Sequence, residues 1–230
     1  MRVLFFTVFL IVSCSQDELI EEQTLKVFEE QKIRFDSGLI NNENEVTRTI
    51  GSGRVVLKKI EFPMTGNFHR ANAIITLKSI GDPWDKSGSF FILPGADLGN
   101  LNEVTSLELL RFITPFGVGH FNNKENIQKL KPSYIPRWED DITWEEDISH
   151  LLPVLKDQVW VGLYIDTWSN EGWSVDVGFK FDEYYTKKNK PLKTIFPLLN
   201  TTPMFPGQSG YDKFASEPIT KKFKLAKDYS

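Results

Sequence analysis

One stretch alternates apolar and polar residues over its whole length and decides the fold class: Trp173-Ser174-Val175-Asp176-Val177-Gly178-Phe179-Lys180-Phe181. Successive side chains of a β-strand point to opposite faces, so the apolar residues share one face and the polar residues share the other. One buried face and one solvated face are typical of a strand in an antiparallel sheet. The stretch therefore predicts an all-β protein built from antiparallel strands.

Further runs of β-branched and aromatic residues follow Arg54 and are separated by Gly, Pro, Asn and Asp. They lie at residues 55–62, 71–79, 89–93, 108–114, 146–152, 160–168 and 193–199. About eight such runs in one domain predict an antiparallel β-sandwich or eight-stranded jelly roll, here over about residues 47–199. A weak helical periodicity is confined to residues 25–35. The expected core residues are Val55, Leu57, Ile74, Leu77, Phe112, Leu163, Val175, Val177 and Phe179.

The run at 160–168 has an unusual second face. Its first face is apolar, whereas the other carries Trp160, Tyr164, Asp166 and Trp168. A carboxylate between large aromatic rings on an exposed face suits a sugar-binding floor, because rings pack on C–H faces and the acid accepts hydroxyl groups. Residues 169–172 are expected to form a hairpin loop to the next strand, and two registers of that hairpin remain open.

The N-terminus predicts export and a lipid anchor. Arg2 precedes an apolar run at residues 3–12 that is too short to span a bilayer, and Cys14 follows at the expected cleavage point. Residues 11–14 resemble the lipobox of bacterial lipoproteins, in which the cysteine is acylated and binds the membrane. The polar residues 15–18 resemble surface-export tags, although a plain tether fits them equally well. We expect an outer-membrane lipoprotein of the cell envelope, with exposure at the cell surface as one option.

Composition narrows the partners. The net charge is −4 at pH 7, which gives no reason to expect nucleic acid as a partner. Cys14 is the only cysteine, so no disulfide forms within the chain. His69, His120 and His150 are scattered along the sequence, which argues against a copper site built from clustered histidines.

Four segments together resemble one family, the first domain of peptide-N-glycosidase F. They are Arg-Phe-Ile-Thr-Pro-Phe-Gly-Val-Gly-His-Phe at 111–121, Tyr-Ile-Asp-Thr-Trp at 164–168, the strand at 172–181, and Pro-Trp-Asp-Lys at 83–86. The resemblance covers about residues 25–200. It implies a jelly roll from an enzyme that hydrolyses the amide between asparagine and the first N-acetylglucosamine of an N-glycan, without a cofactor.

The resemblance also implies site residues. Asp85 matches the principal catalytic aspartate, which activates or positions water, and Asp166 replaces a catalytic-site glutamate. The shorter side chain would hold its carboxylate back by about 1 Å. Trp84 and Trp168 match tryptophans of the sugar site, whereas Lys86 replaces an arginine and, with Tyr164, is expected to bind substrate. From the residues alone, Asp85 could equally be a turn residue and Asp166 a solvated strand residue.

Two departures from the family qualify these expectations. The family example has a cysteine pair before its Trp-Asp motif, whereas residues 76–82 have none, so we expect packing to hold this loop. We predict residues 1–13 as signal peptide, 14–24 as lipidated tether, 25–200 as jelly roll, and 201–230 as linker and start of a second domain. The partner carboxylate of that second domain has no match here. The expected function is an amidase domain with little activity alone, either incomplete as given or completed by a second jelly roll on a separate chain. The alternative is a non-catalytic lipoprotein that binds glycan or another partner.

The lipid anchor gives a direct test. Replacing Cys14 by Ser removes the thiol to which the lipid is attached, so we expect an unprocessed precursor that incorporates no labelled palmitate in bacterial cells. The parent, expressed in the same strain, is the control. Equal labelling of parent and variant would refute the assignment.

Overall fold

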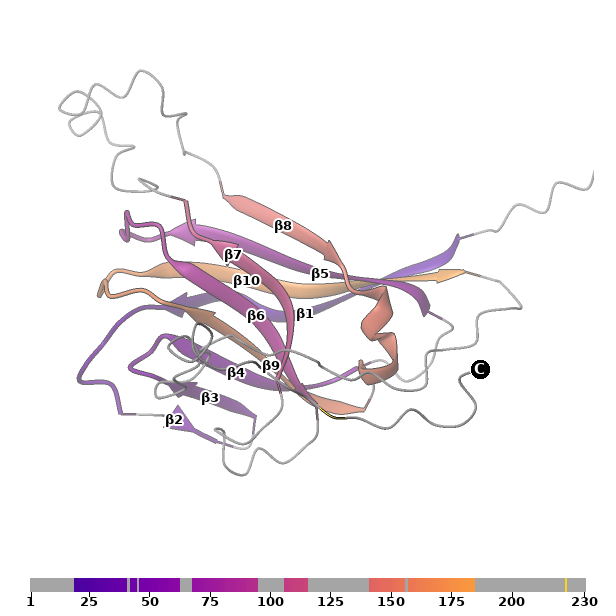
Figure 1. Cartoon of the computed structure of the whole chain (residues 1–230), viewed down its shortest axis with the longest axis horizontal. Helices are drawn as coiled ribbons and strands as arrows, with labels where there is room; N and C mark the ends of the chain where they lie inside the picture. Colours follow the sequence, from indigo (N-terminus) through magenta and orange to yellow (C-terminus); the bar gives the residue numbers. More distant parts are fainter. Residues whose placement is uncertain are drawn as a thin grey trace, which may run out of the picture.

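The computed structural model describes residues 19–40, 42–44, 46–62, 68–94, 106–115, 141–155, 157–184 and 222. Within them, ten strands form two antiparallel sheets that pack face to face, the predicted sandwich of the jelly-roll type, and the sheets do not close into a barrel (Figure 1). Cys14, the expected strand at 193–199 and nearly all of the expected linker at 201–230 lie outside the described residues. No helix in the described part of the chain is long and apolar enough to cross a membrane.

The two sheets share the strands unequally. The four-stranded sheet has, in order, β1 (Leu19–Ile33), β10 (Trp173–Tyr184), β5 (Phe68–Ser79) and β8 (Ile142–Asp147). The six-stranded sheet has, in order, β2 (Asn42–Glu43), β3 (Thr47–Ile50), β4 (Val55–Glu61), β9 (Gln158–Ile165), β6 (Ser87–Pro94) and β7 (Leu107–Ile113). A short 3₁₀ helix, η1 (Ser149–Val154), follows β8.

The helical periodicity at 25–35 was misleading, because this segment is most of β1. β1 pairs with β10, but its register shifts between Lys26 and Phe28 and again between Phe28 and Gln31. These β-bulges place an extra residue in the strand, and Glu30 there has a φ of 49°. Val27 and Phe28 are consequently both buried, so the period-2 signal of a strand is lost.

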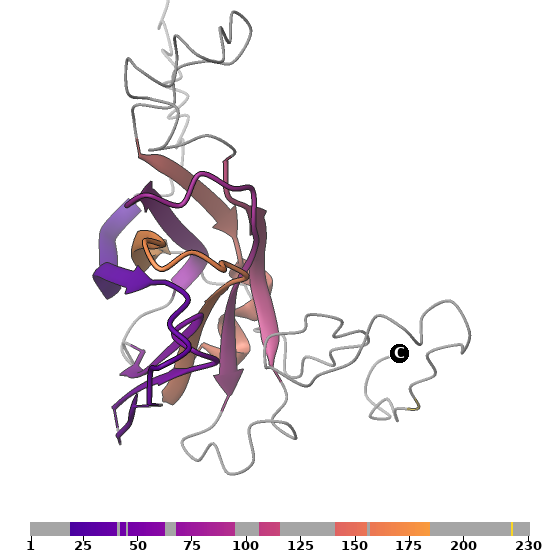
Figure 2. The same ribbon diagram turned by 90° about the vertical axis from the view of Figure 1, so that its left-hand side faces the viewer.

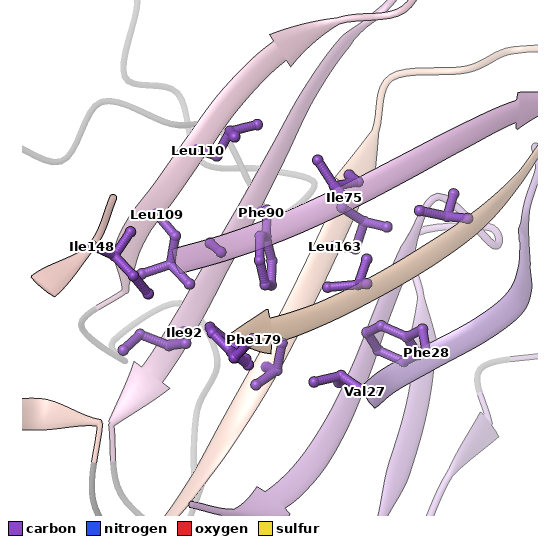
Figure 3. Packing of buried hydrophobic residues seen from close by; sticks show 14 of the residues in the cluster. Val27, Phe28, Ile75, Phe90, Ile92, Leu109, Leu110, Ile148, Leu163 and Phe179 are labelled. Atoms are coloured by element: carbon purple, nitrogen blue, oxygen red, sulfur yellow. The ribbon is translucent and has the colours of Figure 1, made fainter. Parts of the chain in front are cut away.

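The main core lies between the sheets and is rich in phenylalanine. Figure 3 shows Phe90 and Leu163 of the six-stranded sheet beside Ile75 and Phe179 of the four-stranded sheet. Phe179 is fully buried, and its ring centroid lies 5.0 Å from that of Phe62 and 5.4 Å from that of Phe90. The core predictions are confirmed here for Leu77, Phe112, Leu163, Val175, Val177 and Phe179.

The central strands of the six-stranded sheet, β4, β9 and β6, carry buried residues on both faces. Its outer face carries a second cluster of Ile50, Val55, Leu57, Phe91, Leu93 and Trp160, against which Tyr164 packs. Val55 and Leu57 are therefore buried as predicted, but on the face away from the other sheet. Val56, between them, points into the core between the sheets. Burial on both faces explains the unbroken apolar runs of β6 and β9, as in other strands covered on two sides.

Two predictions about the four-stranded sheet were wrong. Ile75, not Ile74, points into the core, because alternation along β5 puts Ile75 on the same face as Leu77, with Ala73 and Ala71. Only the first two residues of the run at 146–152 belong to a strand, because β8 ends at Asp147. The Asp147 carboxylate accepts hydrogen bonds from the amide and hydroxyl groups of Ser149, the first residue of η1.

The expected hairpin at 169–172 is also wrong, because β9 and β10 belong to different sheets. Both strands have apolar inner faces, and a crossing between the sheets lets both faces enter the same core. The connection from β5 to β6 crosses in the opposite direction at the same end. Figure 1 shows both connections at the left-hand end of the sandwich, and Figure 2 looks onto that end.

The phenylalanine core generates a stability prediction. Replacing Phe179 by Ala should lower the free energy of unfolding by about 3–5 kcal/mol, since it leaves a cavity between the sheets. The control is Ile113→Ala on the edge strand β7, where the side chain is 65% exposed and the expected change is within about 0.5 kcal/mol. Denaturant unfolding measures both, and equal losses would contradict the described packing.

Candidate functional site

The site is assembled from three connections at one end of the sandwich. The Ile80 amide donates to the Gly172 carbonyl at 3.1 Å, which ties the β5–β6 connection to the β9–β10 connection. The Asp166 amide donates to the Ser87 carbonyl at 2.9 Å, and the Ile165 amide donates to the Arg54 carbonyl of the β3–β4 turn at 3.1 Å. Backbone hydrogen bonds thus fix the three connections to one another.

The Asp82 carboxylate lies at the centre of this end and is fully buried. One oxygen accepts the Trp84 amide at 3.1 Å. The other accepts the Thr167 hydroxyl at 2.5 Å and the indole N–H of Trp173 at 3.2 Å. A buried carboxylate requires such donors, and these come from both connections and the first residue of β10. Asp82 therefore holds Trp84 and the residue before Trp168 in place.

Thr114, at the end of β7, holds the same loop from the other side. Its hydroxyl donates to the Trp84 carbonyl at 2.9 Å and accepts the Lys86 amide at 2.7 Å. Its own amide donates to the Lys86 carbonyl at 2.8 Å. Residues 76–82, which were expected to depend on packing, are mostly the end of β5, and the loop that follows them is held by hydrogen bonds with Asp82 and Thr114.

Arg54 organises the opposite side of the site. Its guanidinium group lies 3.3 Å from an Asp166 carboxylate oxygen and donates to the Gly51 carbonyl at 3.0 Å. It also lies over the rings of Trp168 and Phe35, 4.5 Å and 5.6 Å from their centroids. The Asp166 side chain is 41% exposed, and its orientation is set by this partner. Ion pairing and ring stacking together make Arg54 a rigid support for Asp166 and Trp168.

A shallow pocket of about 460 Å³ opens between the β5–β6 connection and the β9–β10 connection. Its lining consists of Gly81, Pro83, Trp84, Lys86, Trp168, Ser169 and Glu171. The indole groups of Trp84 and Trp168 are 53% and 60% exposed, which is unusual for such large apolar rings. Asp85 is exposed and stands in the chain between the lining residues Trp84 and Lys86, and Asp166 stands two residues before Trp168, but neither belongs to the lining.

The structure brings most of the predicted site residues to this end. Trp84, Lys86 and Trp168 share the pocket, and Asp85 and Asp166 stand within two residues of these lining residues in the sequence. The expectation that Trp160 is exposed was wrong, because its ring is only 2% exposed and belongs to the second cluster, with Arg48 over its face. Tyr164 is half-buried against the same cluster, and its role toward a substrate stays a prediction.

Sequence reasoning missed four residues of this end, namely Arg54, Asp82, Thr114 and Glu171. Thr114 lies inside a segment that resembles the family and Asp82 directly precedes another, yet nothing in the sequence distinguishes a buried Asp from a turn Asp. Arg54 precedes a strand and Glu171 sits in the expected hairpin, where charged residues are ordinary. In the described part of the chain, no group of three His, Cys, Asp or Glu side chains is placed to hold a metal ion.

The role of Asp82 can be tested with two Asp→Asn changes three positions apart. In Asp82→Asn, the amide group must face at least one of three donors, so we expect a loss of about 2–3 kcal/mol in the free energy of unfolding. Asp85→Asn is the matched control, because Asp85 is exposed and its change should stay within about 0.5 kcal/mol. Equal denaturation midpoints for the two variants would contradict the network.

Comparisons with known proteins agree with this architecture. A search of curated proteins found no significant sequence match. Among solved structures, PNGF-II in a C2 crystal form is similar with a TM-score of 0.64 and 23% identity, over 80% of this chain and 38% of that chain. PNGF-II in a P2₁ crystal form gives 0.58 and 24% over 72% and 35%. PNGase F, a glycosylasparaginase from Flavobacterium meningosepticum, gives 0.48 and 19% over 71% and 42%.

The two similarities to PNGF-II show the fold, and this chain covers 35–38% of the length of those structures. The family profile described as peptide-N-glycosidase F, N terminal, matches residues 24–106 and 98–181. The matched region contains both connections of the site and accounts for more than half of the 230 residues. The chain therefore belongs to the family of peptide-N-glycosidase F N-terminal domains.

Proposed function

We propose that this domain binds the core N-acetylglucosamine of asparagine-linked glycans and supplies part of the site of an amidase that hydrolyses the Asn–GlcNAc amide. The observation that carries the proposal is the pairing of exposed Trp84 and Trp168 around one pocket beside two carboxylates, Asp85 and Asp166. Family membership supports the same substrate class. In keeping with the sequence, the proposal includes a lipid anchor at Cys14 and a place in the cell envelope.

Sugar binding follows from the chemistry of the pocket. The apolar faces of a pyranose ring pack on indole rings, and two such rings are held here by Asp82, Thr114 and Arg54. Because these supports fix the rings before a ligand arrives, binding requires little ordering of side chains. Lys86 in the lining can donate a hydrogen bond to a sugar oxygen.

Hydrolysis requires that water attacks the side-chain carbonyl of the glycosylated asparagine and that the C–N bond breaks. The products are an aspartate side chain and a glycosylamine, which takes a proton on its nitrogen. Asp85 is exposed next to Trp84 and is the candidate to position the water. Asp166 already pairs with Arg54, so its candidate role is to orient polar groups of the substrate.

A non-catalytic glycan-binding function is the second candidate, and specific observations favour it. Asp166 is shorter than the glutamate of the family pattern and is bound by Arg54. Neither Asp85 nor Asp166 lines the pocket. Misplacement of a catalytic group by about 1 Å can reduce a rate on the order of 100-fold. We therefore expect this chain by itself to bind glycan weakly and to release little or none.

Binding and release are tested together on the purified protein, residues 15–230, which keeps β1 whole. Trp168→Ala removes one stacking face, so the dissociation constant for N,N′-diacetylchitobiose, measured by calorimetry, should rise by about tenfold. Trp160→Phe, in the second cluster, is the control and should bind like the parent. Absence of binding by the parent would overturn the proposal.

Release is measured on a denatured N-glycoprotein by the mobility shift of the protein. No shift with measurable chitobiose binding would support the non-catalytic candidate. Clear glycan release by the parent and none by Asp85→Asn would show that this chain is an active amidase, with Asp85 as a catalytic residue.

A further inference from the structure

We propose that Glu171 is the acceptor that orients the sugar in the pocket between Trp84 and Trp168. The inference rests on the proposed binding of N-acetylglucosamine and names a further residue for it. Glu171 lies in the β9–β10 connection, and it is the only carboxylate in the described lining of the pocket. Asp85 and Asp166, which the sequence favoured, lie outside that lining.

The backbone around Glu171 is held firmly. Its amide donates to the Ser169 hydroxyl at 3.1 Å. The next residue, Gly172, has a φ of 73°, and its carbonyl accepts the Ile80 amide at 3.1 Å and the Asp82 amide at 3.5 Å. A side chain at Gly172 would collide with the Ile33 carbonyl, so the chain passes close to β1 here. Glu171 is thus carried by a connection with little freedom to move.

Gly81 provides the space that the Glu171 side chain occupies. Its φ is 136°, a conformation that favours glycine, and a methyl group there would overlap the Glu171 side chain from Cβ to the carboxylate. The side chain therefore lies across the β5–β6 connection, on the wall of the pocket that also carries Pro83 and Trp84. Packing on Gly81 fixes the direction of a side chain that would otherwise be free in solvent.

The carboxylate of Glu171 is available to a ligand. Glu171 is exposed, and among the described residues no side chain or backbone group donates to its carboxylate or forms an ion pair with it. The Asp82 carboxylate, by contrast, accepts hydrogen bonds from Trp84, Thr167 and Trp173. The Asp166 carboxylate pairs with Arg54. Glu171 is therefore an unoccupied acceptor beside two indole rings and the Lys86 donor.

This arrangement selects the edge of a pyranose. A carboxylate accepts two hydrogen bonds at once, which suits neighbouring donors such as a hydroxyl group and the N–H of an acetamido group. The indole rings hold the faces of the sugar and do not distinguish its edges. Glu171 therefore determines which way the sugar lies, and its charge disfavours acidic sugars in the same place.

The test compares Glu171→Gln and Glu171→Ala with the control Glu61→Gln. Glu61 is an exposed glutamate at the end of β4 that lies away from Arg54. Calorimetric titration with N,N′-diacetylchitobiose should show a dissociation constant raised about fivefold by Gln and about tenfold or more by Ala. Glu61→Gln should match the parent. All variants should keep the melting temperature of the parent, because neither glutamate is buried.

A second ligand separates recognition from a merely structural effect. A disaccharide with glucuronic acid should bind the parent more weakly than chitobiose. Glu171→Gln should reduce the ratio of the two dissociation constants, because the like charge is removed. Structural damage would weaken both ligands equally. If the parent binds chitobiose and both Glu171 variants bind it within twofold, this inference is overturned while the proposed function stands. If the parent binds no chitobiose, the proposed function fails and the inference fails with it.

Discussion

The buried carboxylate of Asp82 is the constraint on which the functional end of this sandwich depends. It joins the β5–β6 connection, the β9–β10 connection and the start of β10 through three donors. Burial of a carboxylate is costly unless its oxygens are satisfied, so the two connections must adopt the conformation that supplies these donors. The two exposed indoles and Glu171 are placed by this requirement, and Thr114 and Arg54 complete their support.

The fold was largely predictable because alternation along β10 is a local signal that needs no partner. The failures have one physical origin, which is that contacts between residues far apart in the sequence are invisible in a local pattern. The bulges of β1 removed its alternation, and the second cluster made β6 and β9 apolar on both faces. The crossing from β9 to β10 looked like a hairpin, because residues 169–172 carry ordinary turn chemistry.

The site was predictable only as far as the resemblance of short segments reached. Trp84, Lys86 and Trp168 do share a pocket. Trp160, which the sequence placed on the same strand face as Trp168, is instead buried, with Arg48 over its ring. Asp82 and Glu171 have partners more than 80 residues away in the sequence, Thr167 and Gly81 respectively. Arg54 pairs with Asp166, which is more than 100 residues away. Such roles appear only when the connections are folded against one another.

The most direct test of the account is a crystal structure of the protein soaked with N,N′-diacetylchitobiose. We expect one sugar ring stacked on Trp84 or Trp168, with Glu171 and Lys86 within hydrogen-bonding distance of its polar groups and Asp82 unmoved beneath it. An empty pocket in crystals whose solution form binds the sugar, or a sugar bound on another face of the sandwich, would contradict the assignment of this end as the glycan site.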